Sequence, residues 1–273
     1  MDSEKEYINI TEIQKIMLDI LRDVITFCNN NDYHYILTGG SALGATRHKG
    51  FIPWDDDMDI ALPRNEYEQF IHKYQPQYSN LVKLNSENTK NWLYPYTRIS
   101  DSKTVAEGRW AEVQNGVYVD IFPIDAISGN KTGQIIGYLK MKYLDVMRNS
   151  TRRIAISKEE PFWWLKPLLI KFAKRKSTGE WVNKMERLAQ KSNRKHFNYS
   201  NAFSLFVVQG LNKRRENFNK DMYFKRNKAV FEGESVFVPG NVNQYLTQMY
   251  GNWENIPNNI EKKTHARFYR KGI

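Results

Sequence analysis

Residues 39–63 read GGSALGATRHKGFIPWDDDMDIALP, and this stretch decides the fold. It joins a glycine turn at its start to a run of carboxylates near its end. YHYIL, just before it, predicts a short strand, and SALGATRH after the double glycine predicts a short helix. Further on, Asp57, Asp59 and Ala61 alternate with apolar residues at a period of two, which predicts a strand with one acidic end.

The glycine turn consists of Gly39, Gly40 and Ser41. Backbone N–H groups at the start of a helix, together with the Ser41 hydroxyl, are suited to bind phosphate oxygens. Tight turns also use glycine only for its conformational freedom, so the turn by itself fits a purely structural role as well. It becomes a candidate phosphate site in combination with the acidic run.

The acidic run places Asp55, Asp56, Asp57 and Asp59 close together in the chain. Carboxylates so close repel one another, and a divalent cation between them removes that repulsion. Alternation along the strand puts Asp57 and Asp59 on one face, where they could hold one ion or bridge two. Asp120, in the alternating stretch VYVDI, would join them if its strand pairs alongside. Carboxylate oxygens favour Mg²⁺ or Mn²⁺, so we predict a site for one of these ions.

Two other interpretations of the acidic run compete. It fits an exposed acidic turn, although apolar residues precede it. It also fits the spacing of a calcium-binding EF-hand loop running from Asp55 to Glu66. Against the calcium loop, Ile60 occupies the position where the sharp turn requires glycine, and Pro63 adds rigidity.

The remaining pattern predicts an α/β (α+β) protein. Apolar residues recur at helical spacing over 11–28, and Thr11 with Gln14 fits a capping box. We expect a mixed β-sheet core flanked by helices over 1–128, and a mainly helical region over 129–273, packed together as one compact unit. The other expected helices cover 64–74, 134–156, 163–174 and 180–196, and the other expected strands cover 81–87, 94–100 and 116–125.

Composition limits the partners. The formal net charge is +11, which indicates an anionic partner: nucleic acid, anionic lipid or a phosphorylated substrate. Cys28 is the only cysteine, so the chain excludes an intramolecular disulfide and a cysteine-rich zinc site. The N-terminus lacks the pattern of a secretory signal, and we expect a cytoplasmic protein without a transmembrane helix.

The most apolar stretch, PFWWLKPLLIKFA at 161–173, is shorter than a membrane span and is followed by basic residues. Two interpretations remain open. It is either a buried amphipathic helix or a peripheral contact with the anionic inner face of the plasma membrane.

Together, the Gly-Gly-Ser turn, the Asp-x-Asp strand and a later strand aspartate have the layout of the nucleotidyltransferase fold. The sequence resembles the LicD family, which is related to fukutin-type phosphotransferases. The resemblance rests on residues 39–63, YTRISDSKT at 96–104, GVYVDIFPID at 116–125 and VPGNVNQYLTQMYGNWENIP at 238–257. It extends from about residue 10 to the end of the chain, and it is loose over 130–230.

Members of this family transfer phosphocholine from CDP-choline to sugars of lipid-linked cell-surface glycans, such as lipopolysaccharide or teichoic acid, and release CMP. The resemblance implies Mg²⁺ or Mn²⁺ on Asp57, Asp59 and Asp120, with Asp120 as the proton acceptor and Asp55 or Asp56 as substitutes. It implies substrate-binding roles for Gly39, Gly40, Ser41, Arg47, His48, Arg98, Asp55, Asp56 and His265. Among these, Arg47, His48 and Arg98 would lie near the pyrophosphate.

Other functions remain open. A nucleotidyltransferase acting on nucleic acid fits the fold and the charge, although the back half lacks a recognisable RNA-binding motif. The donor could carry another phospho-alcohol, such as ethanolamine or ribitol phosphate, or the chain could be a non-catalytic nucleotide-binding relative. A choline head group would need an aromatic cage, and the candidates, which fit a hydrophobic core equally well, are Trp92, Tyr94, Tyr96, Trp110 and Tyr118.

Overall fold

The computed structural model describes residues 5–90, 92–107, 115–153, 156, 159, 162–256 and 266–271. The chain divides into two compact units. Unit 1 contains Met1–Leu84, Thr97–Ile124 and Phe218–Ile273, and unit 2 contains Asn85–Tyr96 and Asp125–Asn217.

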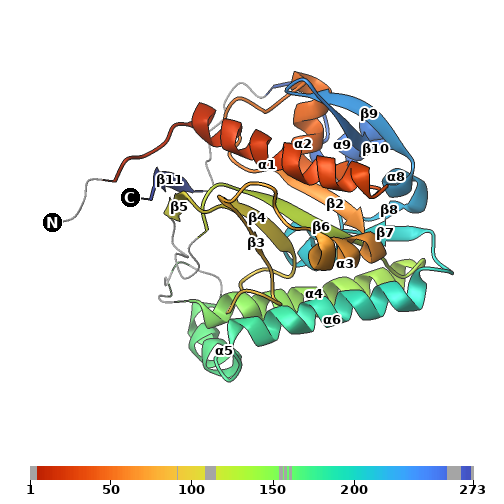
Figure 1. The fold of residues 1–273 in the computed structure, drawn as a ribbon. Helices are drawn as coiled ribbons and strands as arrows, with labels where there is room; N and C mark the ends of the chain where they lie inside the picture. Colours follow the sequence, from red (N-terminus) through yellow and green to blue (C-terminus); the bar gives the residue numbers. More distant parts are fainter. Residues whose placement is uncertain are drawn as a thin grey trace. The chain divides into compact units, whose positions relative to one another are not determined.

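Unit 1 is built on a mixed sheet with the strand order β1-β2-β6-β4-β3 (Figure 1). β2 and β6 are parallel neighbours, whereas the β1–β2, β6–β4 and β4–β3 pairs are antiparallel. Two further antiparallel pairs are β9–β10 and β5–β11. The strands are β1 Ile36–Leu37, β2 Asp59–Pro63, β3 Leu81–Leu84, β4 Thr97–Asp101, β5 Thr104–Glu107, β6 Tyr118–Ala126, β8 Phe218–Asn219, β9 Arg226–Phe231, β10 Glu234–Pro239 and β11 Arg267–Arg270. The sheet confirms the expected fold class.

Helices flank this sheet and bury apolar side chains, as the long first helix shows. Helix α1 contacts β4, and α3 contacts β2. The buried row of α1 includes Met17, Ile20 and Val24, and its Phe27 ring meets Phe70 of α3 edge to face at 5.6 Å. The helices of unit 1 are α1 Ile10–Asn30, α2 Gly39–Leu43, the π-helical turn η1 Gly44–His48, α3 Arg64–Lys73, α8 Lys220–Phe224 and α9 Val242–Tyr250.

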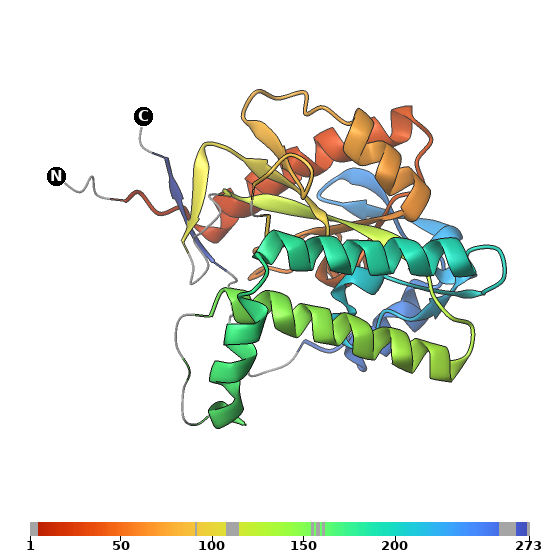
Figure 2. The ribbon, with the colours of Figure 1, turned by 90° about the horizontal axis from the view of Figure 1, so that it is seen from below.

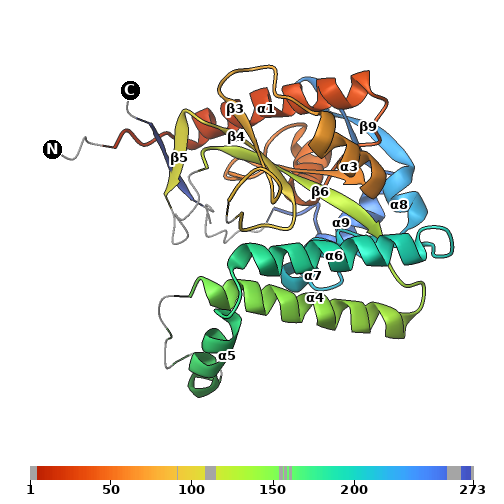
Figure 3. The ribbon, with the colours of Figure 1, turned by 60° about the horizontal axis from the view of Figure 1, so that its bottom comes forward.

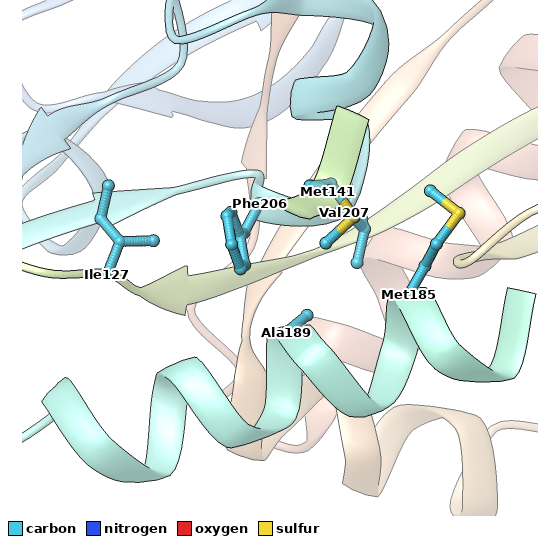
Figure 4. Packing of buried hydrophobic residues seen from close by; sticks show 6 residues of the cluster. All are labelled: Ile127, Met141, Met185, Ala189, Phe206 and Val207. Carbon is cyan, nitrogen blue, oxygen red and sulfur yellow. The ribbon is translucent and has the colours of Figure 1, made fainter. Parts of the chain in front are cut away.

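Unit 2 is mainly helical. Helices α4 and α6 lie side by side, and α5 crosses the end of α4 (Figures 2 and 3). A buried apolar cluster joins α4 and α6 to the segment around η3, with residues Ile127, Met141, Met185, Ala189, Phe206 and Val207 (Figure 4). The elements are α4 Lys131–Thr151, η2 Trp163–Leu165, α5 Lys166–Ala173, α6 Thr178–His196, β7 Ala202–Ser204, η3 Phe206–Val208 and α7 Gln209–Asn212. None of the helices in the described part of the chain is both long and apolar enough to cross a membrane.

The domain division differs from the prediction. Unit 2 begins at Asp125, close to the expected boundary, but residues 218–273 return to unit 1 instead of continuing a helical back half. The reason is tertiary packing: β10 contacts β1, β9 contacts η1, and α9 contacts α2. The chain divides into two units, and the packing of its two halves as one compact unit stays a prediction.

Two local boundaries also differ. The first helix begins at Ile10 and is capped by Asn9, whose side chain accepts the Glu12 N–H, so the capping box at Thr11 and Gln14 is wrong. The acidic strand begins at Asp59, whereas the alternation predicted a strand that already includes Asp57. Asp57 therefore precedes the strand, and the strand alternation that was to place it beside Asp59 does not apply.

Candidate active site

Hydrogen bonds connect the glycine turn to β2. The Thr38 N–H donates to the Asp59 carbonyl at 3.0 Å, and the Asp59 N–H donates to Ser41 Oγ at 2.9 Å. Gly39 has a φ of +53°, and a Cβ at this position would lie 3.0 Å from Oδ2 of Asp59. Only glycine adopts this left-handed conformation readily and leaves room for the carboxylate.

A second carboxylate lies against the next residue of the turn. A Cβ on Gly40 would lie 2.8 Å from Oδ2 of Asp55. Asp55 is held in place by backbone contacts, because its N–H donates to Ile52 and its carbonyl accepts from Nε2 of Gln14 at 3.0 Å. The two glycines thus allow two carboxylates to approach the backbone of one turn.

Strand pairing brings a third carboxylate to this place. In the parallel register of β2 and β6, Asp59 stands opposite Asp120, so the expected pairing of these two strands is confirmed. On the other side of β6, Asp120 stands opposite Arg98 of β4. Side chains of directly paired residues leave a sheet on the same face. Asp59, Asp120 and Arg98 therefore form a row across three neighbouring strands.

Arg98 and Asp120 form a bidentate ion pair. Arg98 Nε donates to Oδ1 of Asp120 at 2.6 Å, and Nη2 donates to Oδ2 at 3.0 Å. Both residues are buried, with 4% and 6% of their surface exposed, and the guanidinium lies 3.4 Å from the centroid of the Tyr118 ring. The pair holds a positive and a negative charge next to Asp59 in a fixed geometry. We call Gly39, Gly40, Ser41, Asp55, Asp59, Arg98 and Asp120 the carboxylate edge.

The other two aspartates of the acidic run differ in burial. Asp56 is 1% exposed, and its Oδ2 accepts the Ala266 N–H at 3.3 Å. Asp57 is half-buried and lies just before β2. Asp56 therefore links the run to the C-terminal segment, a structural role that the acidic pattern did not reveal.

Arg47 and His48 lie at the end of the π-helical turn η1. Arg47 Nε donates to Nε2 of His48 at 3.0 Å, and Nη1 donates to the Trp253 carbonyl at 2.6 Å. Burial, and then the positive charge of Arg47, lowers the pKa of His48, so the ring is neutral near pH 7 and can accept this hydrogen bond. Burial also lowers the pKa of Arg47.

The remaining predicted residues are His265 and the candidates for an aromatic cage. His265 and Trp110 fall outside the described residues. Trp92, Tyr94 and Tyr96 form an aromatic row within unit 2, with successive ring centroids 5.3 and 5.2 Å apart. Tyr118 lies in unit 1, where it covers Arg98.

Sequence reasoning missed Tyr245, Gln14 and Trp253. The Gly39 N–H donates to the Tyr245 hydroxyl at 3.0 Å, so α9 holds the glycine turn from the far end of the chain. The stretch NQYLTQMYG at 243–251 carried a signal for this, because it belongs to a motif of the family resemblance. Trp253 lies in the same motif, whereas no pattern in a single sequence indicates the contact of Gln14 with Asp55.

No metal cluster is preformed in the described part of the chain: no group of three or more His, Cys, Asp or Glu side chains has an arrangement that could hold an ion. The chemistry of the edge nevertheless fits Mg²⁺ or Mn²⁺, because Asp59 and Asp120 are paired hard-oxygen ligands on adjacent strands. Asp120 would have to share its carboxylate between the ion and Arg98. The metal ligands Asp57, Asp59 and Asp120 therefore stay a prediction.

Comparison with known proteins shows which family this geometry is similar to. Residues 32–148, which contain the whole carboxylate edge, match the nucleotidyltransferase domain of the LicD/FKTN/FKRP family. The lipopolysaccharide cholinephosphotransferase LicD of Haemophilus influenzae is 29% identical over 275 residues, which cover 94% of this chain and 96% of that protein.

Two uncharacterized proteins show shorter similarities. One, from Rickettsia typhi, is 32% identical over 81 residues, covering 29% of this chain and 26% of that protein. The other, from Rickettsia prowazekii, is 34% identical over 65 residues, covering 24% of each chain. The domain match includes the carboxylate edge, and the similarity to the Haemophilus protein extends over nearly the full chain. This chain is therefore similar to the LicD family, and it is a transferase of phosphorus-containing groups.

Proposed function

We propose that this protein transfers phosphocholine from CDP-choline to a sugar hydroxyl of a lipid-linked cell-surface glycan, of the lipopolysaccharide or teichoic-acid type, and releases CMP. The observation that carries the proposal is the similarity, over 94% of the chain, to a lipopolysaccharide cholinephosphotransferase. The carboxylate edge supports it, because it combines a backbone turn suited to phosphate with fixed charges of both signs.

In the proposed reaction, the acceptor oxygen attacks the choline-bearing phosphorus of the donor. The new oxygen–phosphorus bond forms as the bond to CMP breaks, and CMP leaves with the electrons of that bond. The turn Gly39–Ser41 would bind the pyrophosphate, and Arg98 would oppose the charge that develops during transfer. Mg²⁺ or Mn²⁺ held by Asp57, Asp59 and Asp120 would supply further charge neutralisation when bound.

A carboxylate of the edge would accept the proton of the attacking hydroxyl. The expected proton acceptor is Asp120, with Asp55 or Asp56 as alternatives. Both oxygens of Asp120 accept hydrogen bonds from Arg98, and Asp56 is buried against the backbone of Ala266. Asp55 lies at the glycine turn, with its Oδ2 beside Gly40, and the three aspartates stay candidates.

Product analysis tests the proposal. Purified protein is incubated with Mg²⁺, a glycolipid acceptor and one of three donors, CDP-choline, CDP-ethanolamine or CDP-ribitol, and the acceptor is weighed by mass spectrometry. We expect CMP release and an acceptor heavier by one phosphocholine group, with CDP-choline alone. If another donor modifies the acceptor, the transferred group is that donor's alcohol phosphate and not phosphocholine. If a separate assay shows incorporation of labelled nucleotide into RNA, the protein is a nucleotidyltransferase acting on nucleic acid.

The matched control for this assay is a pair of aspartate variants in unit 1. Asp59→Asn alters the carboxylate edge, whereas Asp19→Asn alters a surface residue of α1 whose side chain is 55% exposed and lies 3.3 Å from Arg22. We expect product from the wild type and from Asp19→Asn, and none from Asp59→Asn. Equal product from both variants would separate the activity from the carboxylate edge.

A further inference from the structure

A continuous segment of unit 2 exposes large apolar side chains. Leu168 is 70% exposed and Trp164 is 63% exposed. We call Phe162–Lys176 the α5 surface, since it contains η2, α5 and the three basic residues that follow. Its exposed apolar side chains are Phe162, Trp163, Trp164, Leu165, Leu168 and Phe172. Exposure of a continuous group of large apolar side chains to water is unfavourable, so these residues indicate a contact site.

The exposure is not a sign of poor packing, because the opposite face of α5 is well anchored. Ala173 is buried with Met147 and Trp181, and Leu169 packs against this cluster. Trp181 Nε1 donates to the Ala173 carbonyl at 3.0 Å. The helix therefore has a fixed inner face, and its outer apolar face is free to meet a partner.

The charge of the α5 surface has one sign only. The segment contains no Asp or Glu, and its basic residues are Lys166, Lys171, Lys174, Arg175 and Lys176. The Arg175 guanidinium lies 5.4 Å from the ring centroid of Phe172, so basic and aromatic groups are interleaved. A cleft of about 590 Å³ is lined by Arg153, Ile156, Pro167, Ile170, Lys171, Lys174 and Arg175. The surface combines positive charge, exposed aromatic rings and a basic cleft.

Helix α6 of the same unit also has a basic outer face, and it differs from α5 in where its large apolar residues lie. Its exposed basic residues are Lys184, Arg187, Lys191, Arg194 and Lys195. Its large apolar residues Trp181, Val182 and Met185 are buried instead of exposed. α6 is thus an ordinary amphipathic helix with a basic outer face, whereas α5 exposes apolar and basic residues together.

We propose that the α5 surface binds the surface of an anionic lipid bilayer. Exposed Trp and Phe rings prefer the level of the lipid head groups, and Lys and Arg beside them are attracted to lipid phosphates. The segment is too short to cross the bilayer, so it lies in the interface. A protein partner would need acidic groups to match this charge, whereas an anionic bilayer supplies both the negative charge and the apolar layer beneath it.

Vesicle sedimentation of the full chain tests this proposal without any donor or acceptor, so its outcome is independent of the proposed reaction. Vesicles of phosphatidylglycerol mixed with phosphatidylcholine are compared with vesicles of phosphatidylcholine alone. We expect binding to the anionic vesicles and at least tenfold weaker binding to the neutral ones. Absence of binding to both would overturn the proposal.

Three variants assign the binding to this surface. Replacing Lys171, Lys174 and Arg175 by Gln should weaken binding about a hundredfold, since each basic side chain near an anionic surface contributes about fivefold. Replacing Trp164, Leu168 and Phe172 by Ser should weaken it at least tenfold. The matched control replaces Arg187, Lys191 and Arg194 of α6 by Gln, which removes the same charge and should change binding less than threefold.

Circular dichroism checks that each variant keeps the wild-type helix content, which the exposure of the altered side chains leads us to expect. Equal losses from the α5 and α6 charge variants would mean binding by net charge, contrary to the proposal. Unchanged binding of the apolar variant would exclude insertion of the rings. Dimers that disappear in the apolar variant, without vesicle binding by the wild type, would assign the surface to a second copy of the chain.

Discussion

The carboxylate edge of unit 1 and the α5 surface of unit 2 both depend on charged side chains, but they hold them in opposite ways. The edge collects its residues from segments far apart in the sequence, and its Arg98 and Asp120 are buried and joined by two hydrogen bonds. The α5 surface takes its charges from one continuous segment and exposes Lys171, Lys174 and Arg175 to solvent.

This difference teaches where each region is sensitive. In the Arg98–Asp120 pair, removing one charge leaves the other buried without this counterion, so a single substitution of the pair has a large effect on stability that salt hardly changes. On the α5 surface, each charge contributes a small, additive attraction that salt screens.

Arg98→Met is expected to destabilise the protein by about 3–5 kcal/mol, because it leaves the buried Asp120 carboxylate without this ion pair. The double variant Arg98→Met/Asp120→Asn should lose less than the sum of the two single variants. Urea unfolding of the four proteins measures this coupling. Strictly additive losses would show that the pair does not act as a unit.

Gly39→Ala is expected to cost about 1–2 kcal/mol, because alanine is strained at a φ of +53°, and its Cβ would press on Asp59. Turnover should fall more than tenfold as the turn shifts. The matched control is Gly179→Ala in α6, where a Cβ meets nothing within 4 Å and should stabilise by about 0.5–1 kcal/mol. Thermal unfolding distinguishes the two, and a neutral Gly39→Ala would contradict the described turn.

Ser177→Ala is expected to cost about 1 kcal/mol, because it removes the capping box at the start of α6. CMP release should stay within twofold of the wild type, since the change lies in unit 2. Asn9→Ala removes the N-cap of α1, so its loss of stability provides a matched value for unit 1. A large loss of turnover in Ser177→Ala with normal stability would mean that unit 2 takes part in catalysis.

Leu168→Ser is expected to change stability by less than about 0.5 kcal/mol, because the side chain is 70% exposed. Its neighbour Leu169 packs against the cluster of Met147, Ala173 and Trp181, so Leu169→Ser should cost clearly more. Urea unfolding of both variants checks which face of α5 is buried. Equal costs would contradict the orientation of this helix.

Much of the edge could be predicted from the sequence, because its signals are local. The period-two alternation around Asp59 and around Asp120 identified two strands, and the structure pairs them. The double glycine marked the turn, which the +53° φ of Gly39 explains. The long apolar periodicity of α1 and α6 identified the helices that the structure contains.

The sequence could not predict features that depend on contacts between residues far apart in the chain. It also could not predict which of several neighbouring residues makes a given contact. Asp57 follows the same alternation as Asp59 but lies before the paired part of β2, because pairing with another strand decides where a strand begins. Asn9 caps α1 instead of Thr11, because the oxygen that reaches the free N–H decides the cap. The contact of Tyr245 with Gly39 spans most of the chain, and the motif that contains Tyr245 does not identify its partner.

The central claim is that the carboxylate edge performs metal-dependent phosphoryl-group transfer, and the initial rate of CMP release from CDP-choline tests it most directly. The rate is measured with a glycolipid acceptor over a Mg²⁺ titration, for the wild type, Asp59→Asn and Asp19→Asn. We predict a saturable Mg²⁺ dependence in the wild type and in Asp19→Asn, and a rate lower by about a thousandfold in Asp59→Asn, with its unfolding temperature unchanged. A wild-type rate that persists in excess EDTA, or an Asp59→Asn rate within a few fold of the wild type, would contradict the claim.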